Sequence, residues 1–181
     1  MTARALPTGL GALLLLATVG SANAVEPGGW YLAPGAQVVE LDGWDAGSGG
    51  ALTLGWKLPY QHSDTPRSSI ALELEVADTA GAMTRGSGGG EERADVRQAG
   101  AYLALNTYMS ERWFHQARLG ALIREIRKPD DDETSGRLGF GLGLGFRATD
   151  HLEILARGEV QFLQASTDLL GTGTLSARWH F

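Results

Sequence analysis

The chain has 181 residues, with 26 glycines, no cysteine and a formal net charge of −6 at pH 7. The absence of cysteine excludes disulfides, a thiol nucleophile, a thiolate metal site and a lipid anchor on an N-terminal cysteine. The acidic balance argues against a nucleic-acid partner, because phosphate binding requires a basic patch.

The first residues have the pattern of an export signal. Arg4 gives a positive start, residues 10–19 are a short apolar run, and residues 22–24 form a small-x-small cleavage site. The apolar run is too short to cross a bilayer as a helix, which takes ~20 residues. We therefore expect residues 1–24 to be a cleaved signal peptide and residues 25–181 to form one domain.

After the signal, successive segments alternate between apolar and polar positions, which is the pattern of barrel strands. In the last and clearest segment, Leu175, Ala177, Trp179 and Phe181 share one face and polar side chains share the other. This alternation predicts antiparallel strands that each have one apolar face. In chain order the segments are residues 30–41, 52–58, 69–76, 98–106, 116–124, 138–147, 152–162 and 172–181.

The first of these segments has the least regular pattern, because it contains Pro34. Proline has no N–H to donate to a neighbouring strand. We therefore expect a bulge or an irregular pairing at Pro34, and the phase of this strand stays open.

The connections between the segments differ in length. Residues 110–112 and 149–151 are tight turns, whereas four other connections are long and polar. Short turns at one end and long loops at the other are typical of outer-membrane barrels. The long loops are residues 42–50, 78–94, 128–136 and 164–171, and residues 59–68 depart from the rule as a long connection at the short-turn end.

Aromatic residues cluster where the short turns should lie. Amphipathic rings favour the membrane interface, so we expect a belt there. Its candidates are Trp30, Tyr60, Tyr108, Trp113, Phe114, Trp179 and Phe181.

A soluble sandwich or a lipocalin-like barrel would also alternate, because one sheet face packs on a core. In one segment, however, Gly139, Gly141, Gly143 and Gly145 occupy the polar face, and a narrow lumen needs such small residues. A closed barrel also pairs every backbone group, as lipid demands. We therefore predict an all-β, eight-stranded antiparallel transmembrane β-barrel in the bacterial cell outer membrane.

The polar faces carry charged residues that should point into the lumen. Charges in a narrow lumen are costly unless they are paired. One interpretation is a structural salt-bridge network that plugs the barrel, and the other is a rearrangeable gate or narrow conduit. The pairs cannot be assigned, because the register of the strands is unknown. The residues are Lys57, Glu73, Glu75, Arg118, Arg157, Glu159 and Arg178.

Two further patterns do not make a site. Residues 130–133 are four consecutive carboxylates, but their spacing is not that of an EF-hand. We interpret them as solvated loop charge, and weak divalent bridging to lipopolysaccharide is the alternative. The alternating glycines lack the spacing of a dinucleotide-binding loop. We therefore predict no catalytic residue, no cofactor and no metal site.

Four segments carry a resemblance to a known family: GGWYLAPGAQ (28–37), GFGLGLGFRATD (139–150), HLEILARGEVQF (151–162) and LSARWHF (175–181). The chain resembles the small outer-membrane barrels that include the OmpA transmembrane domain and OmpX-like proteins. The resemblance implies the barrel fold, the outer-membrane location and insertion by the barrel-assembly machinery. That machinery's recognition signal would be Phe181 together with Trp179.

Some small outer-membrane barrels are enzymes that transfer or remove acyl chains, and they use His near the outer rim. Here His62, His115, His151 and His180 all fall near the predicted periplasmic end. We therefore expect a non-enzymatic protein with a role in envelope integrity or surface interaction. A narrow or gated pore and a lipid-modifying enzyme are the alternatives. The expected partners are outer-membrane lipid, lipopolysaccharide and the assembly machinery; the oligomeric state stays open.

Overall fold

The computed structural model describes residues 29–41, 45–58, 68–79, 83–87, 90–127, 132–162 and 170–181. The expected signal peptide at residues 1–24 lies outside them. Within the described part of the chain, no helix is long and apolar enough to cross a membrane.

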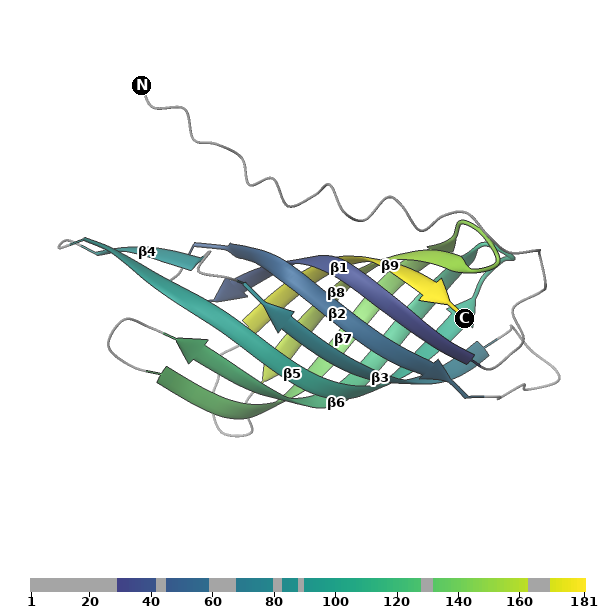
Figure 1. Ribbon diagram of the computed structural model, residues 1–181, viewed down its shortest axis with the longest axis horizontal. Helices are drawn as coiled ribbons and strands as arrows, with labels where there is room; N and C mark the ends of the chain where they lie inside the picture. The colour runs from purple at the N-terminus through teal and green to yellow at the C-terminus, as the bar shows by residue number, and fades with distance from the viewer. Residues whose placement is uncertain are drawn as a thin grey trace, which may run out of the picture.

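Antiparallel strands form the whole framework, and the pairing of β3 with β5 closes them into a ring (Figure 1). Among the described strands, eight make this ring, in the order β3, β2, β1, β9, β8, β7, β6, β5, while β4 pairs with β5 outside it. The predicted eight-stranded antiparallel barrel is confirmed. The strands are β1 (Gly29–Leu41), β2 (Gly47–Lys57), β3 (Ser68–Asp78), β4 (Met83–Ser87), β5 (Gly90–Tyr108), β6 (Trp113–Arg127), β7 (Asp132–Arg147), β8 (Leu152–Phe162) and β9 (Leu170–His180).

Pro34 interrupts one ladder without shifting it. The pairing of β1 with β9 stops after Leu32, opposite Trp179, and resumes at Gly35, opposite Ser176, in the same register. The predicted irregular pairing is therefore found, whereas the predicted alternative of a bulge is not. The missing N–H of proline accounts for the gap. The inward position of Tyr31 and Ala33, both buried, settles the phase of β1.

The two ends of the barrel differ. We call the end with the turns between β5 and β6 and between β7 and β8 the inner end, and the end that carries β4 the outer end (Figure 1). At the outer end, two predicted loops are wrong in part. Met83–Ser87 pairs with the start of β5 inside the expected loop 78–94, and β7 begins at Asp132 inside the expected loop 128–136. The strands continue here through backbone pairing, of Met83–Ser87 with the start of β5 and of the start of β7 with the end of β6, although residues 132–136 contain no apolar residue.

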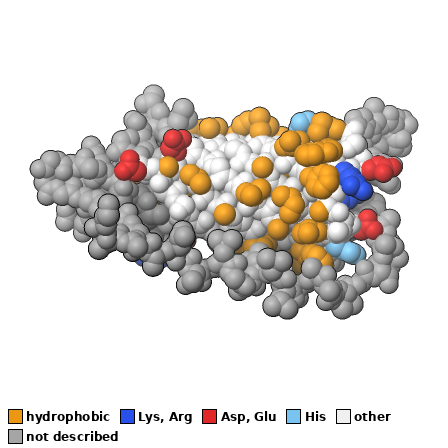
Figure 2. Space-filling view, turned by 90° about the horizontal axis from the view of Figure 1, so that it is seen from above, with side chains coloured by type: hydrophobic (Ala, Val, Ile, Leu, Met, Phe, Trp, Pro, Cys, Tyr) orange, Lys and Arg blue, Asp and Glu red, His pale blue; other side chains and the backbone are white. Residues whose placement is uncertain are grey.

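The outward face of the strands is an apolar surface. Leu74, Leu103, Leu119 and Leu142 are each more than half exposed, and Figure 2 shows apolar side chains densest toward the inner end. Lipid-facing residues of outer-membrane barrels have this character.

Aromatic pairs lie on this surface near the inner end: Trp30 stacks on Trp56 at 6.1 Å, and Trp113 lies 5.0 Å from Phe146. Two members of the predicted belt are inside the barrel instead. Phe114 is fully buried, and the Tyr108 hydroxyl meets luminal charges. Tyr60 lies outside the described residues.

Candidate functional site in the barrel lumen

The structure places all seven luminal residues of the sequence-based set on the inward faces of five strands. Each is at most 6 % exposed. Because every charged group here is shielded from water, the pairing of these groups decides whether the lumen is stable. By strand they are Lys57 (β2), Glu73 and Glu75 (β3), Arg118 (β6), Arg157 and Glu159 (β8), and Arg178 (β9).

Arg118 is the centre of the first cluster. Its guanidinium donates to both carboxylate oxygens of Glu75, at 2.8 and 2.9 Å, and its Nε donates to Glu159 at 2.7 Å. The Tyr102 ring lies 3.8 Å from the guanidinium carbon. A forked, planar guanidinium suits this two-carboxylate arrangement, which a lysine could not reproduce.

Arg157 ties the same cluster across the barrel. Its Nη2 donates to Glu75 at 2.6 Å. Arg157 is on β8 and Glu75 is on β3, and these strands are diametrically opposite in the ring. The ion pair therefore crosses the full width of the lumen.

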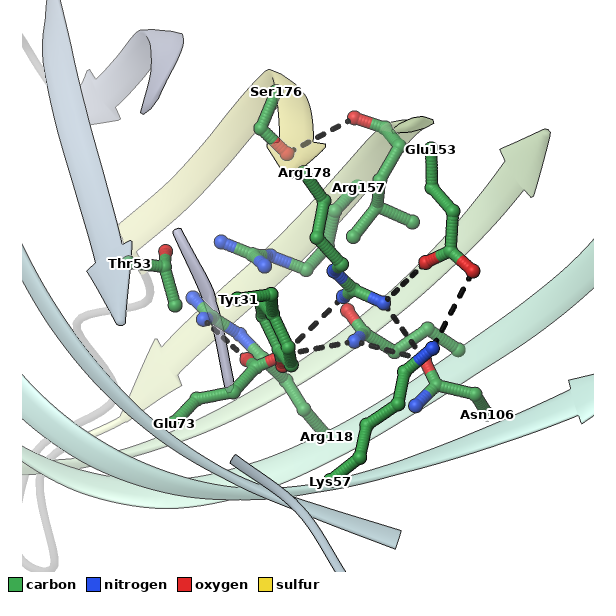
Figure 3. A network of polar contacts seen from close by, with 12 residues as sticks. Tyr31, Thr53, Lys57, Glu73, Asn106, Arg118, Glu153, Arg157, Ser176 and Arg178 are labelled. Carbon is green, nitrogen blue, oxygen red and sulfur yellow. Dashed lines mark hydrogen bonds and ion pairs between the residues drawn. The ribbon is translucent and has the colours of Figure 1, made fainter. Parts of the chain in front are cut away.

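A second cluster surrounds Arg178 (Figure 3), and it lies nearer the inner end because its Glu153 directly follows the turn between β7 and β8. Arg178 donates to Glu73 at 3.3 Å and to Glu153 at 3.1 Å. The Tyr31 hydroxyl donates to the same Glu73 at 2.5 Å, and Arg118 approaches it at 3.5 Å. Glu73 thus links the two clusters into one network.

Glu153 belongs to this network but not to the sequence-based set. It accepts from Lys57 at 3.4 Å and from Tyr108 at 3.2 Å, and His180 and Arg147 lie 3.0 and 3.6 Å away. It lies on the same inward face of β8 as Arg157 and Glu159, and this alternation could have identified it from sequence.

The central charges balance within the described residues. Lys57, Arg118, Arg157 and Arg178 face Glu73, Glu75, Glu153 and Glu159, all buried. Burying ions costs several kcal/mol each unless partners compensate, and removing one partner of a buried pair costs about 3–5 kcal/mol. Pairing among these eight groups therefore compensates the cost of burying them, and two further arginines, Arg124 and Arg137, are buried nearer the outer end.

Glycines make room for the aromatic rings of the network. A Cβ at Gly55 would lie 2.0 Å from the Tyr31 ring, and one at Gly145 would lie 2.0 Å from the Phe114 ring. In each case the glycine is the direct cross-strand partner of the aromatic residue. Such aromatic–glycine pairs fix register and fill the lumen. Alternation alone does not determine the register of neighbouring strands, so these pairs could not be predicted.

The remaining candidates lie apart from this network. Asp132 and Glu133 belong to β7 at the outer end, whereas residues 130–131 and His62 lie outside the described residues. His115 is exposed, and His151 stacks on Trp179. Among the described residues, no group of three or more His, Asp or Glu side chains could hold a metal ion.

The two residues of the predicted assembly signal lie on the outside of the inner end. Trp179 is 37 % and Phe181 is 71 % exposed, and the Phe181 amide donates to the Trp30 carbonyl at 3.1 Å. Their role in assembly stays a prediction.

Comparison with known proteins agrees with this architecture. The family described as "Outer membrane protein beta-barrel domain" matches residues 10–181. The crystal structure of Ail, the attachment invasion locus protein of Yersinia pestis, is similar with a TM-score of 0.55 and 15% identity over 85% of this chain and 97% of that chain. Neisserial surface protein A is similar with a TM-score of 0.52 and 13% identity over 84% and 97%. No curated protein sequence matches. At these identities the structural likeness shows the fold alone.

Proposed function

The chain belongs to the outer membrane protein beta-barrel domain family, and we propose that this outer-membrane barrel is closed and non-catalytic, with a role in envelope integrity or surface interaction. The observation that carries the proposal is the luminal network. Arg118 binds Glu75 and Glu159, while Arg157 binds Glu75 from the opposite wall. Charged side chains thus occupy the space that a conducting pore would leave to water.

A gated pore is the alternative. To open the lumen, Arg118 would have to leave two buried carboxylates at once. A buried charge without its partner costs about 3–5 kcal/mol, so an open state without new partners would be rare. The pairing therefore supports a closed lumen.

A lipid-modifying enzyme is the other alternative. Such an enzyme needs a general base near the outer rim, where its lipid substrate lies. Among the described residues, His115 and His151 lie close to the inner-end turns, and His180 lies 3.0 Å from Glu153 in the lumen. This placement supports a non-catalytic role.

The proposed partners follow from the surface. We infer that outer-membrane lipid and lipopolysaccharide surround the apolar belt, and that the assembly machinery recognises Trp179 and Phe181 during insertion. The exposure of both aromatic side chains supports this recognition.

Liposome swelling tests the closed lumen. Liposomes that contain the refolded protein should swell in arabinose no faster than empty liposomes, whereas a general porin included as a positive control should cause rapid swelling. Swelling above the empty-liposome rate, with folding verified by heat-modifiable gel mobility, would contradict the proposal.

A further inference from the structure

Near the outer end of β5 the inward and outward faces exchange their chemical character, although the alternation of the side chains continues unbroken. Lower on this strand, Ala99 and Leu103 face outward, and Gln98 and Tyr102 are buried inside. Above Gln98 the inward residues are Ala94 and Val96, each 2 % exposed, and the outward residues are charged. The outward charged residues are Arg93, Asp95 and Arg97.

The neighbouring strand reverses at the same height. On β6, Ile123 faces outward at 62 % exposure, whereas Ile126 is buried and is flanked by outward-facing Glu125 and Arg127. Ile126 is paired with Val96, and Glu125 is paired with Arg97. The exchange therefore occurs at the same height on β5 and β6. We call the paired residues Val96 and Ile126 the row of reversal.

The reversal has a physical cause in the surrounding solvent. A strand in lipid places apolar side chains outward, whereas a strand in water places polar side chains outward and apolar ones in a core. Exposed ion pairs occupy the outward face above the row, with Arg97 2.9 Å from Asp78 and Arg127 2.8 Å from Glu125. The row thus marks where the wall leaves the hydrocarbon.

The buried apolar residues above the row meet across the lumen. Val96, Ala94 and Ile126 form one cluster with Val39 and Leu170, each at most 3 % exposed. Val39 is on β1, opposite β6 in the ring, and Leu170 is on β9, opposite β5. The cluster therefore joins facing walls, and we call these five residues the apolar seal.

We propose that the apolar seal is a second, independent closure of the lumen, so that water from the cell exterior does not reach the charged network. This inference rests on the proposed closed lumen and adds that the outer mouth stays shut when the charged network is broken. Small apolar side chains packed across a narrow opening exclude water, because the space between them offers it no polar partner.

Gln98 lies between the apolar seal and the charged network, so a cysteine at this position can measure whether water from outside reaches the space between them. Its side chain is 7 % exposed, lies one inward position below Val96, and accepts a hydrogen bond from Gln161 at 2.9 Å. The chain has no cysteine, so Gln98→Cys introduces a unique thiol. A membrane-impermeant maleimide applied to intact cells measures access from outside.

In the otherwise unchanged barrel, Gln98→Cys should label slowly, and an Arg97→Cys control should label fast because Arg97 faces outward and is exposed. Adding Val39→Ser and Ile126→Ser should raise the Gln98→Cys rate roughly tenfold or more, since the protecting contacts are lost. Adding Arg118→Ala and Arg157→Ala should leave it slow. A Glu125→Ser change, at the same height but facing outward, is the matched control and should have no effect.

Fast labelling of Gln98→Cys in the otherwise unchanged barrel would overturn the inference, because the apolar seal would then not exclude water. Fast labelling only after the Arg118→Ala and Arg157→Ala changes would also overturn it, because the seal would then depend on the charged network. An unchanged rate after opening the seal would overturn it as well. Heat-modifiable gel mobility confirms that each variant is folded, and the milder pair Val39→Ala and Ile126→Ala replaces the serine pair if that pair does not fold. Neither result bears on the swelling of liposomes by the unmodified protein, so the two proposals fail separately.

Discussion

The barrel wall has two regions in which polar and apolar residues alternate along the strands. Apolar side chains face outward in one region and inward in the other. In the region between the aromatic pairs and Arg97, leucines face outward, and the inward residues include charged groups, glycines and the rings of Tyr31, Tyr102 and Phe114. In the outer region, Val96 and Ile126 face inward while Arg97 and Glu125 face outward. The strands run through both regions without a break in register.

This difference shows that alternation alone does not say which face is the core. In the lower region the surrounding lipid accepts apolar side chains, so the polar ones must find partners inside. In the outer region water surrounds the wall, so the apolar side chains pack together inside, as in a soluble protein. We infer that the row of Val96 and Ile126, where apolar side chains pass from the outward to the inward face, marks the membrane boundary.

The largest expected effect comes from breaking the charged interior of the lower region. Arg118→Ala would leave Glu75 and Glu159 with fewer partners, and we expect it to reduce the free energy of unfolding by about 3–5 kcal/mol. Urea unfolding in detergent or lipid, followed by tryptophan fluorescence, measures this change. Arg127→Ala removes an exposed ion pair in the outer region and should cost no more than about 1 kcal/mol. Equal losses for the two variants would contradict the contrast between the regions.

The next effect comes from placing a charge on the outward face. Leu119→Arg, in the middle of the apolar belt, should reduce the free energy of unfolding in lipid by about 2–4 kcal/mol. Thr134→Arg, above the row of reversal and beside Glu125, should change it by about 0.5 kcal/mol or less, because the site is in water. The same urea titration in bilayers compares them. A similar penalty at both positions would mean that the boundary is not at this row.

The smallest effect concerns the exposed pair at the boundary. Asp78→Asn removes the negative charge that lies 2.9 Å from Arg97 and should lower the free energy of unfolding by less than about 1 kcal/mol. The loss should shrink further in high salt, since exposed pairs are screened. Urea titrations at low and high salt test this, and Glu75→Gln on the same strand is the comparison, with a larger loss that salt reduces less. A salt-independent loss for Asp78→Asn would show that this pair is not in water.

Much of the fold could be predicted because alternation is local. The inward position of Arg157 and Glu159 and the outward position of Trp179 follow from the period of two alone. The pairs could not be predicted, because contacts such as Arg157 with Glu75 depend on register across the ring. Two strands extend beyond their predicted ends: β5 begins at Gly90 and not at Gln98, and β6 ends at Arg127 and not at Arg124. These extensions were missed because the apolar residues move there from the outward to the inward face. Phe114 was assigned to the surface belt because a ring's preference for the interface does not reveal which face of the strand it occupies.

Single-channel conductance of four chains tests the double closure most directly: the unmodified barrel, Arg118→Ala with Arg157→Ala, Val39→Ser with Ile126→Ser, and all four changes together. Each is first shown to be folded by heat-modifiable gel mobility. We expect silence from the first three and discrete openings from the fourth alone. Openings in the unmodified barrel or in either double variant, or silence of the folded fourth chain, would contradict it.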